Sequence, residues 1–321
     1  MVLGTAKSSQ EATFLGGEHY NLQVHESSPK RRPLAKPVQS GTSTSLVPHA
    51  LWRKRFSPAV RFATQSPNTP RTWGRMRPSR SLALGVIPEV DSMIRVVPTP
   101  ELLSIDRDWW QARAHARMSE VSPGDPGYLE WGPLRLCSLD RIAAGGAFDM
   151  HCHEDIEIVT IVLEGVFGHR DSAGGVGTQS APCVATTSAG SGIEHCEAAS
   201  DAGPVRVVQI WLEPRTKQRP PVWQSRQAPW TNDLTCLASG SDPGALPIDV
   251  DADVFGCSMA EGSIVERRVL ASRHGYLLTC SGELDVSGHG VQAGERALVD
   301  GPEDLTIRAV QPAEIVLLDL P

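Results

Sequence analysis

Two short pairs of residues in this 321-residue chain carry side chains that bind metal ions. The first pair is His151 and His153, and the second is His195 and Glu197. Each pair has the spacing i, i+2, which in a β-strand projects both side chains to one face, about 7 Å apart. If the two strands face each other, three imidazoles and one carboxylate converge, and this ligand set suits a divalent transition metal. Four protein ligands leave positions open on an octahedral ion, so the pattern predicts a catalytic rather than a structural site.

The residues around the first pair match a pattern found in small β-barrels, G-x5-H-x-H-x3-E followed by a closing Gly. The stretch from Met150 to Gly165 is strand-like, and Glu157 lies four residues beyond His153. Glu157 has the same parity as the histidines, so along a strand it shares their face. It therefore competes with Glu197 as the acidic ligand, and its alternative role is to hold an imidazole through the free ring N–H. We favour Glu197 as the ligand.

Other polar residues close to these pairs are expected to have structural roles. Cys152 and Cys196 sit between the ligands, so alternation turns them to the opposite face, where a small thiol packs well. His169 and Asp171 also alternate, but in a hairpin bounded by a turn. We expect both of them to be structural.

Charge is divided unevenly along the chain. Residues 1–92 carry 13 Lys and Arg against 5 Asp and Glu, whereas the remainder carries 17 against 32. The acidic body makes nucleic acid an unfavourable electrostatic partner. The seven cysteines form no CxxC pair, which indicates a reducing, cytoplasmic compartment. No window approaches the roughly 20 apolar residues of a membrane span.

Residues 1–92 mix Ser, Pro, Thr, Arg and Gly without a sustained period of 2 or 3.6. Such a composition does not repay the entropy of ordering, so we expect a disordered basic extension. The composition of the sequence changes at Met93, which is followed by the short strand-like run Ile94-Arg-Val-Val97.

Beyond Met93, short strand-like segments separated by Gly-rich turns predict an all-β fold of sandwich or barrel type. The strands expected in the first half are 134–142, 156–164, 166–171, 182–187 and 205–212. Those expected in the second half are 234–239, 263–270, 275–280, 283–286, 296–299, 305–309 and 314–320. Three prolines between them indicate a linker, since Pro donates no ladder hydrogen bond. We expect a metal-binding domain over 93–213, a linker over 214–232, a second domain without metal ligands over 233–321, and a monomer.

Several motifs in the same order resemble the pirin family, whose members are two-lobed cupins built from jelly-roll barrels. The motifs are His169-Arg-Asp-Ser172, Ser188-Ala-Gly-Ser-Gly-Ile-Glu-His-Cys-Glu197 and Gln209-Ile-Trp-Leu-Glu-Pro214, within a match from about 93 to 321. In pirins the N-terminal lobe binds metal through a His-Pro-His motif and a Gly-Ile-x-His-x-Glu motif. These ligands fall here on His151, His153, His195 and Glu197. Cys152 replaces the usual proline, and the segment from His115 to Ser119 differs from the family's early His-Thr-Phe-Ser-Phe.

The resemblance implies a metal-dependent dioxygenase that acts with O2 on a flavonol or related phenolic substrate, with Fe(2+) as the expected metal. Glu197 or Glu157 would then accept the proton of the substrate hydroxyl. The alternative is a metal- or redox-sensitive regulatory protein that binds a transcription factor or a metabolic enzyme. A third possibility is a cupin that binds metal without a defined reaction.

Overall fold

The computed structural model describes residues 93–118, 121–228 and 230–321. The extension expected to be disordered, residues 1–92, lies outside the described residues. Within them the fold is all-β, as predicted, and the one helical element is a short 3-10 turn, η1 (Thr99–Glu101). The described part of the chain contains no helix with the length and apolar character needed to cross a membrane.

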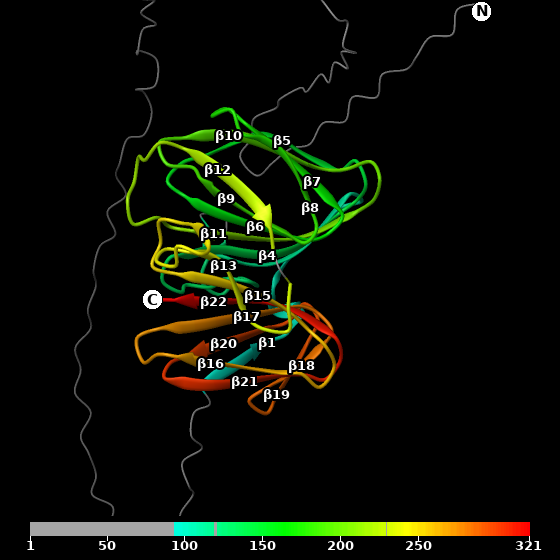
Figure 1. Ribbon diagram of the computed structural model, residues 1–321, viewed down its shortest axis with the longest axis vertical. Helices are drawn as coiled ribbons and strands as arrows, with labels where there is room; N and C mark the ends of the chain where they lie inside the picture. Colours follow the sequence, from blue (N-terminus) through cyan, green and yellow to red (C-terminus); the bar gives the residue numbers. More distant parts are fainter. Residues whose placement is uncertain (1–92, 119–120, 229) are drawn as a thin grey trace, which may run out of the picture. The chain divides into compact units, whose positions relative to one another are not determined.

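The first lobe consists of a seven-stranded and a four-stranded sheet (Figure 1). In spatial order the larger sheet contains β12 (Val222–Gln227), β9 (Cys183–Ser188), β6 (Glu157–Glu164), β11 (Val205–Leu212), β4 (Leu134–Ile142), β3 (Trp110–Ala116) and β2 (Leu103–Asp106). The smaller sheet contains β5 (Ala147–His153), β10 (Ile193–Ala199), β7 (Val166–Asp171) and β8 (Val176–Ser180).

The second lobe repeats this arrangement. Its larger sheet contains β1 (Ile94–Val97), β20 (Arg296–Asp300), β17 (His274–Ser281), β22 (Ala313–Leu320), β15 (Asp253–Met259), β13 (Thr235–Ser239) and β14 (Leu246–Pro247). Its smaller sheet contains β16 (Ile264–Val269), β21 (Glu303–Ala309), β18 (Glu283–Val286) and β19 (His289–Gln292).

The two larger sheets pack against each other, and each smaller sheet covers the opposite face of its own large sheet. Val208 and Ile210 of the first lobe share one core cluster with Val316 and Leu318 of the second. The interiors of the two barrels form separate clusters. Because each large sheet is covered on both faces, its central strands are buried along most of their length, as β6 is. Burial of this apolar surface, at about 25 cal/mol per Å², holds the lobes together.

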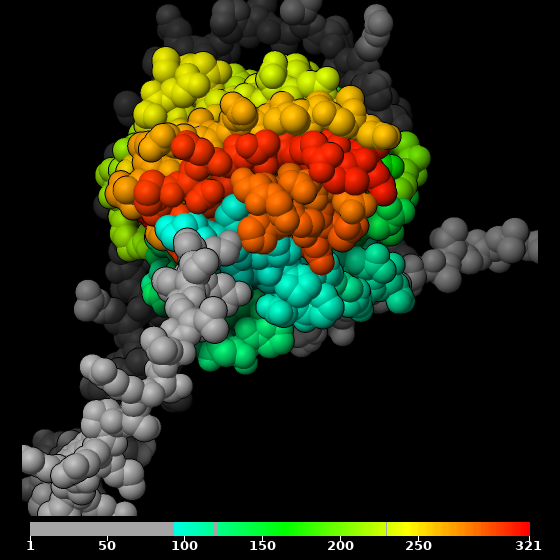
Figure 2. Space-filling view, turned by 90° about the horizontal axis from the view of Figure 1, so that it is seen from below, coloured from blue at the N-terminus to red at the C-terminus, as the bar shows by residue number. Residues whose placement is uncertain are grey.

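Two strands near the predicted domain boundaries pair in ways that the sequence did not indicate. β1 falls in the range expected for the first domain, yet it pairs with β20 of the second lobe, and the first described residues lie against the C-terminal strands in Figure 2. The predicted linker 214–232 contains β12, which pairs with β9 of the first lobe. The prolines that suggested a linker end at Pro221, so the backbone of Val222–Gln227 can still pair.

Candidate metal centre

Strand pairing in the smaller sheet of the first lobe brings three histidines together. β10 lies next to β5, and His195 pairs directly with His151. The ring centroids of His151 and His195 are 4.4 Å apart, and His153 lies 4.9 Å from each of them. The potential ligating atoms of the three side chains all lie within 4.8 Å of one another. Two i, i+2 patterns far apart in the sequence therefore meet inside one barrel.

Glu197 and His169 form a second group with His195. Glu197 pairs with His169 across β10 and β7, and the ligating atoms of these three residues also lie within 4.8 Å of one another. The Nε2–H of Gln209 donates to Oε2 of Glu197 at 2.7 Å, which fixes the carboxylate. His195 belongs to both groups, so it stands at the centre of the cluster.

His169 was expected to be structural, yet it lies among the candidate ligands. Its Nε2 is 2.8 Å from Oδ2 of Asp171, and its ring stacks on Trp223 with the centroids 4.7 Å apart. Its Nδ1 is buried and has no hydrogen-bond partner. The i, i+2 spacing of His169 and Asp171 is the same signal that marked the other two pairs. The proximity of His169 to His195, with ring centroids 5.3 Å apart, depends on strand register, which this spacing does not reveal.

Glu157 lies apart from both groups. The strand-like run that begins at Met150 is interrupted, because β5 ends at His153 and Asp155 adopts a left-handed conformation with φ of 50°. The chain then enters β6 in the other sheet, where Glu157 accepts a hydrogen bond from Ser188 Oγ at 2.7 Å. The shared face expected for Glu157 and the histidines requires an unbroken strand, and the break removes that argument.

Burial controls the electrostatics of the cluster. Burial, with a smaller contribution from neighbouring histidines, lowers the pKa of His153 to about 3 and that of His195 to about 2. The rings are therefore neutral at pH 7 and keep the lone pair that a metal requires. Burial raises the pKa of Glu197 to about 7, against the opposing effect of the Gln209 hydrogen bond. Asp140, inside the same barrel, has its pKa raised to about 6, also mainly by burial.

The donor atoms fit a divalent transition metal. Both ring nitrogens of His195 are buried without a hydrogen-bond partner, which is costly unless another group satisfies them. Nδ1 of His151 lies 2.7 Å from the carbonyl oxygen of Asp149, an arrangement that directs its Nε2 lone pair away from the backbone. Imidazole nitrogens with a carboxylate oxygen form a donor set typical of iron, nickel, copper and zinc sites.

The outer face of the ligand strands is less covered than expected. Cys152 is exposed and Cys196 is half-buried. The packing role predicted for Cys152 is therefore wrong, because its side chain is exposed on the edge strand β5. On the inner face, Trp211 packs edge-on against His153, with the ring centroids 4.9 Å apart.

The fold and the cluster define a two-lobed cupin with one polar barrel. Residues 115–212 match the family model of pirin, and residues 236–320 match that of the quercetinase C-terminal cupin domain. A pirin-like protein of Caulobacter vibrioides is 36% identical over 232 residues, covering 71% of this chain and 99% of that protein. The chain belongs to the pirin family.

Two further similarities concern proteins of Escherichia coli. The chain is 28% identical over 200 residues to quercetin 2,3-dioxygenase of strain K12, covering 61% of this chain and 86% of that protein. The crystal structure of the bacterial pirin YhhW in complex with nickel(II) superposes with a TM-score of 0.66 at 25% identity, covering 71% of this chain and 99% of that one.

Proposed function

We propose that this pirin is a metal-dependent dioxygenase that acts on a flavonol or related phenol, with His151, His153, His195 and Glu197 as metal ligands and iron as the metal. The observation that carries the proposal is the convergence of the imidazoles of His151, His153 and His195, with the buried carboxylate of Glu197 beside His195. Their low pKa values keep these rings in the form that binds a metal. Because four protein ligands leave coordination positions open, the centre can also take a substrate.

Each residue of the cluster has a role that follows from its contacts. A bound divalent metal would supply Lewis acidity and lower the pKa of a coordinated hydroxyl. Gln209 orients Glu197 by its hydrogen bond. Glu197, whose pKa burial raises to about 7 in the metal-free protein, is the residue that we assign to accept the hydroxyl proton of the phenol. Glu157 is the weaker choice for this role, because it accepts the Ser188 hydroxyl within the other sheet.

The substrate class is supported by the family and by the aromatic side chains around the cluster. An Escherichia coli relative carries the name quercetin 2,3-dioxygenase, and the second lobe matches a quercetinase domain. The indoles of Trp211 and Trp223 lie against His153 and His169. Flat apolar surfaces of this kind favour a planar aromatic substrate. Dioxygen is the second substrate of the proposed reaction.

The proposal is tested by reconstituting the metal-free protein with iron, manganese, nickel, cobalt, copper or zinc and following flavonol absorbance under air. We expect turnover with at least one metal and none with the metal-free protein. The His195→Ala variant should lose both metal and turnover. Stoichiometric metal binding without turnover by any metal would exclude dioxygenase activity towards that flavonol.

A further inference from the structure

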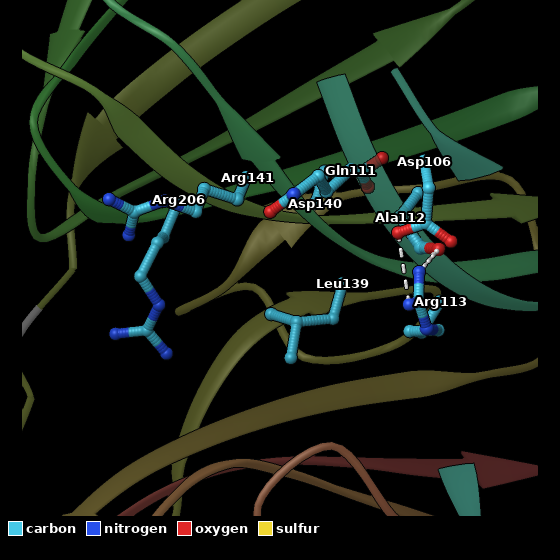
Figure 3. Close-up of a pocket in the computed structure, with 8 residues that line it drawn as sticks. All are labelled: Asp106, Gln111, Ala112, Arg113, Leu139, Asp140, Arg141 and Arg206. Carbon is cyan, nitrogen blue, oxygen red and sulfur yellow. Dashed lines mark hydrogen bonds and ion pairs between the residues drawn. The ribbon is translucent and has the colours of Figure 1, made fainter. Parts of the chain in front are cut away.

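A second candidate site lies in a cleft of about 350 Å³ on the face of the larger first-lobe sheet that is turned away from the histidines (Figure 3). It is lined by Asp106, Gln111, Ala112, Arg113, Leu139, Asp140, Arg141 and Arg206. Along β4, alternation sends Asp140 into the first barrel and sends its neighbours Leu139 and Arg141 to the cleft. The cleft therefore lies on the larger sheet of the first lobe and opens away from the barrel that holds the histidines of the smaller sheet.

Two arginines stand directly opposite each other in this cleft. In the register of β4 and β11, Arg141 pairs with Arg206, and Gln111 of β3 pairs with Arg141 on its other side. Directly opposed residues on neighbouring strands have Cβ atoms about 5 Å apart, and like charges in such positions are destabilising. Both guanidinium groups lie at the same end of the cleft in Figure 3.

Acidic side chains compensate two of the three cleft arginines. Arg113 forms an ion pair with Asp106 at 3.0 Å. Arg206 reaches the second lobe, where it forms an ion pair with Glu314 at 3.3 Å and donates to the carbonyl oxygen of Cys280 at 2.8 Å.

Asp140, next to Arg141 in the sequence, and Glu164, opposite Arg206 in the sheet, do not neutralise Arg141. The carboxylate of Asp140 is engaged inside the barrel, where it accepts hydrogen bonds from Trp110 at 2.7 Å and Ser138 at 2.5 Å. Glu164 faces Arg206 from β6, but no ion pair joins it to an arginine in the described part of the chain. The exposed guanidinium of Arg141 thus remains uncompensated beside a second cation.

We propose that this cleft binds a small organic carboxylate with an apolar body. A guanidinium group presents a planar fork of donors that matches a carboxylate in bidentate geometry, so Arg141 is the primary anchor. Arg206 adds positive charge, and the Gln111 amide adds a donor. Leu139 supplies an apolar surface for the remainder of the ligand. The volume lies within the range of about 300–1,000 Å³ found for small-molecule sites.

Benzoate is the probe for this site, titrated into the metal-loaded full-length protein while the arginine Nε–Hε resonances are followed by NMR. We expect the resonances of Arg141 and Arg206 to shift together. The variant Arg141→Gln should weaken benzoate binding at least tenfold and leave the metal content unchanged. The matched control is Arg268→Gln, which removes an exposed arginine from β16 of the second lobe and should bind benzoate as the parent does.

Two comparisons separate the cleft from nonspecific anion binding. Acetate should bind at least fivefold more weakly than benzoate, because it lacks the group that would contact Leu139. Equal binding of the two anions would remove the apolar part of the proposal. Unshifted Arg141 resonances, or equal benzoate affinity in Arg141→Gln and the parent, would overturn the site itself.

Discussion

The two barrels differ in the side chains that they bury, and the strand in second place across each smaller sheet shows this difference. In the first lobe β10 lies between β5 and β7, and in the second lobe β21 lies between β16 and β18. β10 buries His195 and Glu197 at its central inward positions, whereas β21 buries Leu305 and Ile307. The same position in the same architecture therefore holds candidate metal ligands in one lobe and hydrocarbon in the other.

The neighbouring strands differ in the same way. Glu197 pairs with His169 on β7, while Ile307 pairs with Val286 on β18. In the large sheets, Gln209 of β11 occupies the place that Leu317 of β22 holds in the second lobe. A buried polar group costs free energy unless it is satisfied, so the second barrel can contribute packing energy that the first gives up for its site.

Placing a first-lobe residue in the second barrel should produce the largest change in the stability of the protein. The variant Ile307→Glu puts a carboxylate where every inward neighbour is apolar, with no donor corresponding to Gln209. We expect it to lower the free energy of unfolding by about 4 kcal/mol or more, measured by urea denaturation. The control Ile264→Glu makes the same substitution at an exposed strand position opposite Arg308, and it should change the free energy of unfolding by less than about 0.5 kcal/mol. Similar stability of both variants would show that the second barrel tolerates a site.

The reverse exchange, His195→Leu, should remove the metal while keeping the fold. Leu is the residue at the corresponding position of β21, and it leaves no ring nitrogen unsatisfied. We expect metal affinity, measured by chelator competition, to fall by at least about 100-fold, more than the loss typical of an outer hydrogen-bond partner. His289→Leu in the second lobe should bind metal normally. Unchanged affinity in His195→Leu would remove His195 from the ligand set.

A smaller loss should follow from Gln209→Leu, which installs the residue found at the matching place in β22. Glu197 would lose the donor that orients its carboxylate. Metal affinity should fall by about 10–100-fold, the range for residues that hold a ligand rather than bind the metal. Gln224→Leu on the edge strand β12 changes an exposed amide and should have no effect. A loss as large as that of His195→Leu would imply that Gln209 itself contacts the metal.

Features that depend on local alternation could be predicted from the sequence, and features that depend on distant contacts could not. The i, i+2 pairs gave the three clustered histidines, and the strands 134–142, 166–171, 205–212 and 283–286 have the predicted bounds. β3 was missed because its three alanines have low strand propensity, which pairing with β2 and β4 overrides.

The break after His153 also depends on a distant contact. Gln218, from the Pro-rich stretch, donates its backbone N–H to Asp155 Oδ1 at 2.6 Å. That contact accompanies the left-handed conformation of Asp155, and no local pattern announces it. The position of His169 beside His195, the pairing of β1 with β20 and that of β12 with β9 likewise depend on which strands become neighbours.

The pH dependence of metal binding tests whether the first barrel excludes water as the apolar second barrel does. Burial holds His153 and His195 at pKa values of about 3 and 2, so above pH 4 they release no proton on binding a metal. Glu197, with a pKa of about 7, is protonated below that pH and must lose its proton to become a ligand. Affinity should therefore rise about tenfold per pH unit from about pH 5 to 7 and level off above 8.

Calorimetry in buffers of different ionisation enthalpy would count the protons released as the metal binds. We expect close to one proton at pH 5.5 and close to none at pH 9. Glu197→Gln, which carries no ionisable carboxyl, should show no such change between the two pH values. Release of three or four protons at pH 5.5 would mean that the histidines titrate near their ordinary pKa of about 6.5. Water would then enter the first barrel. In that case burial would not keep its histidines neutral, and low pKa values would not explain how they bind a metal.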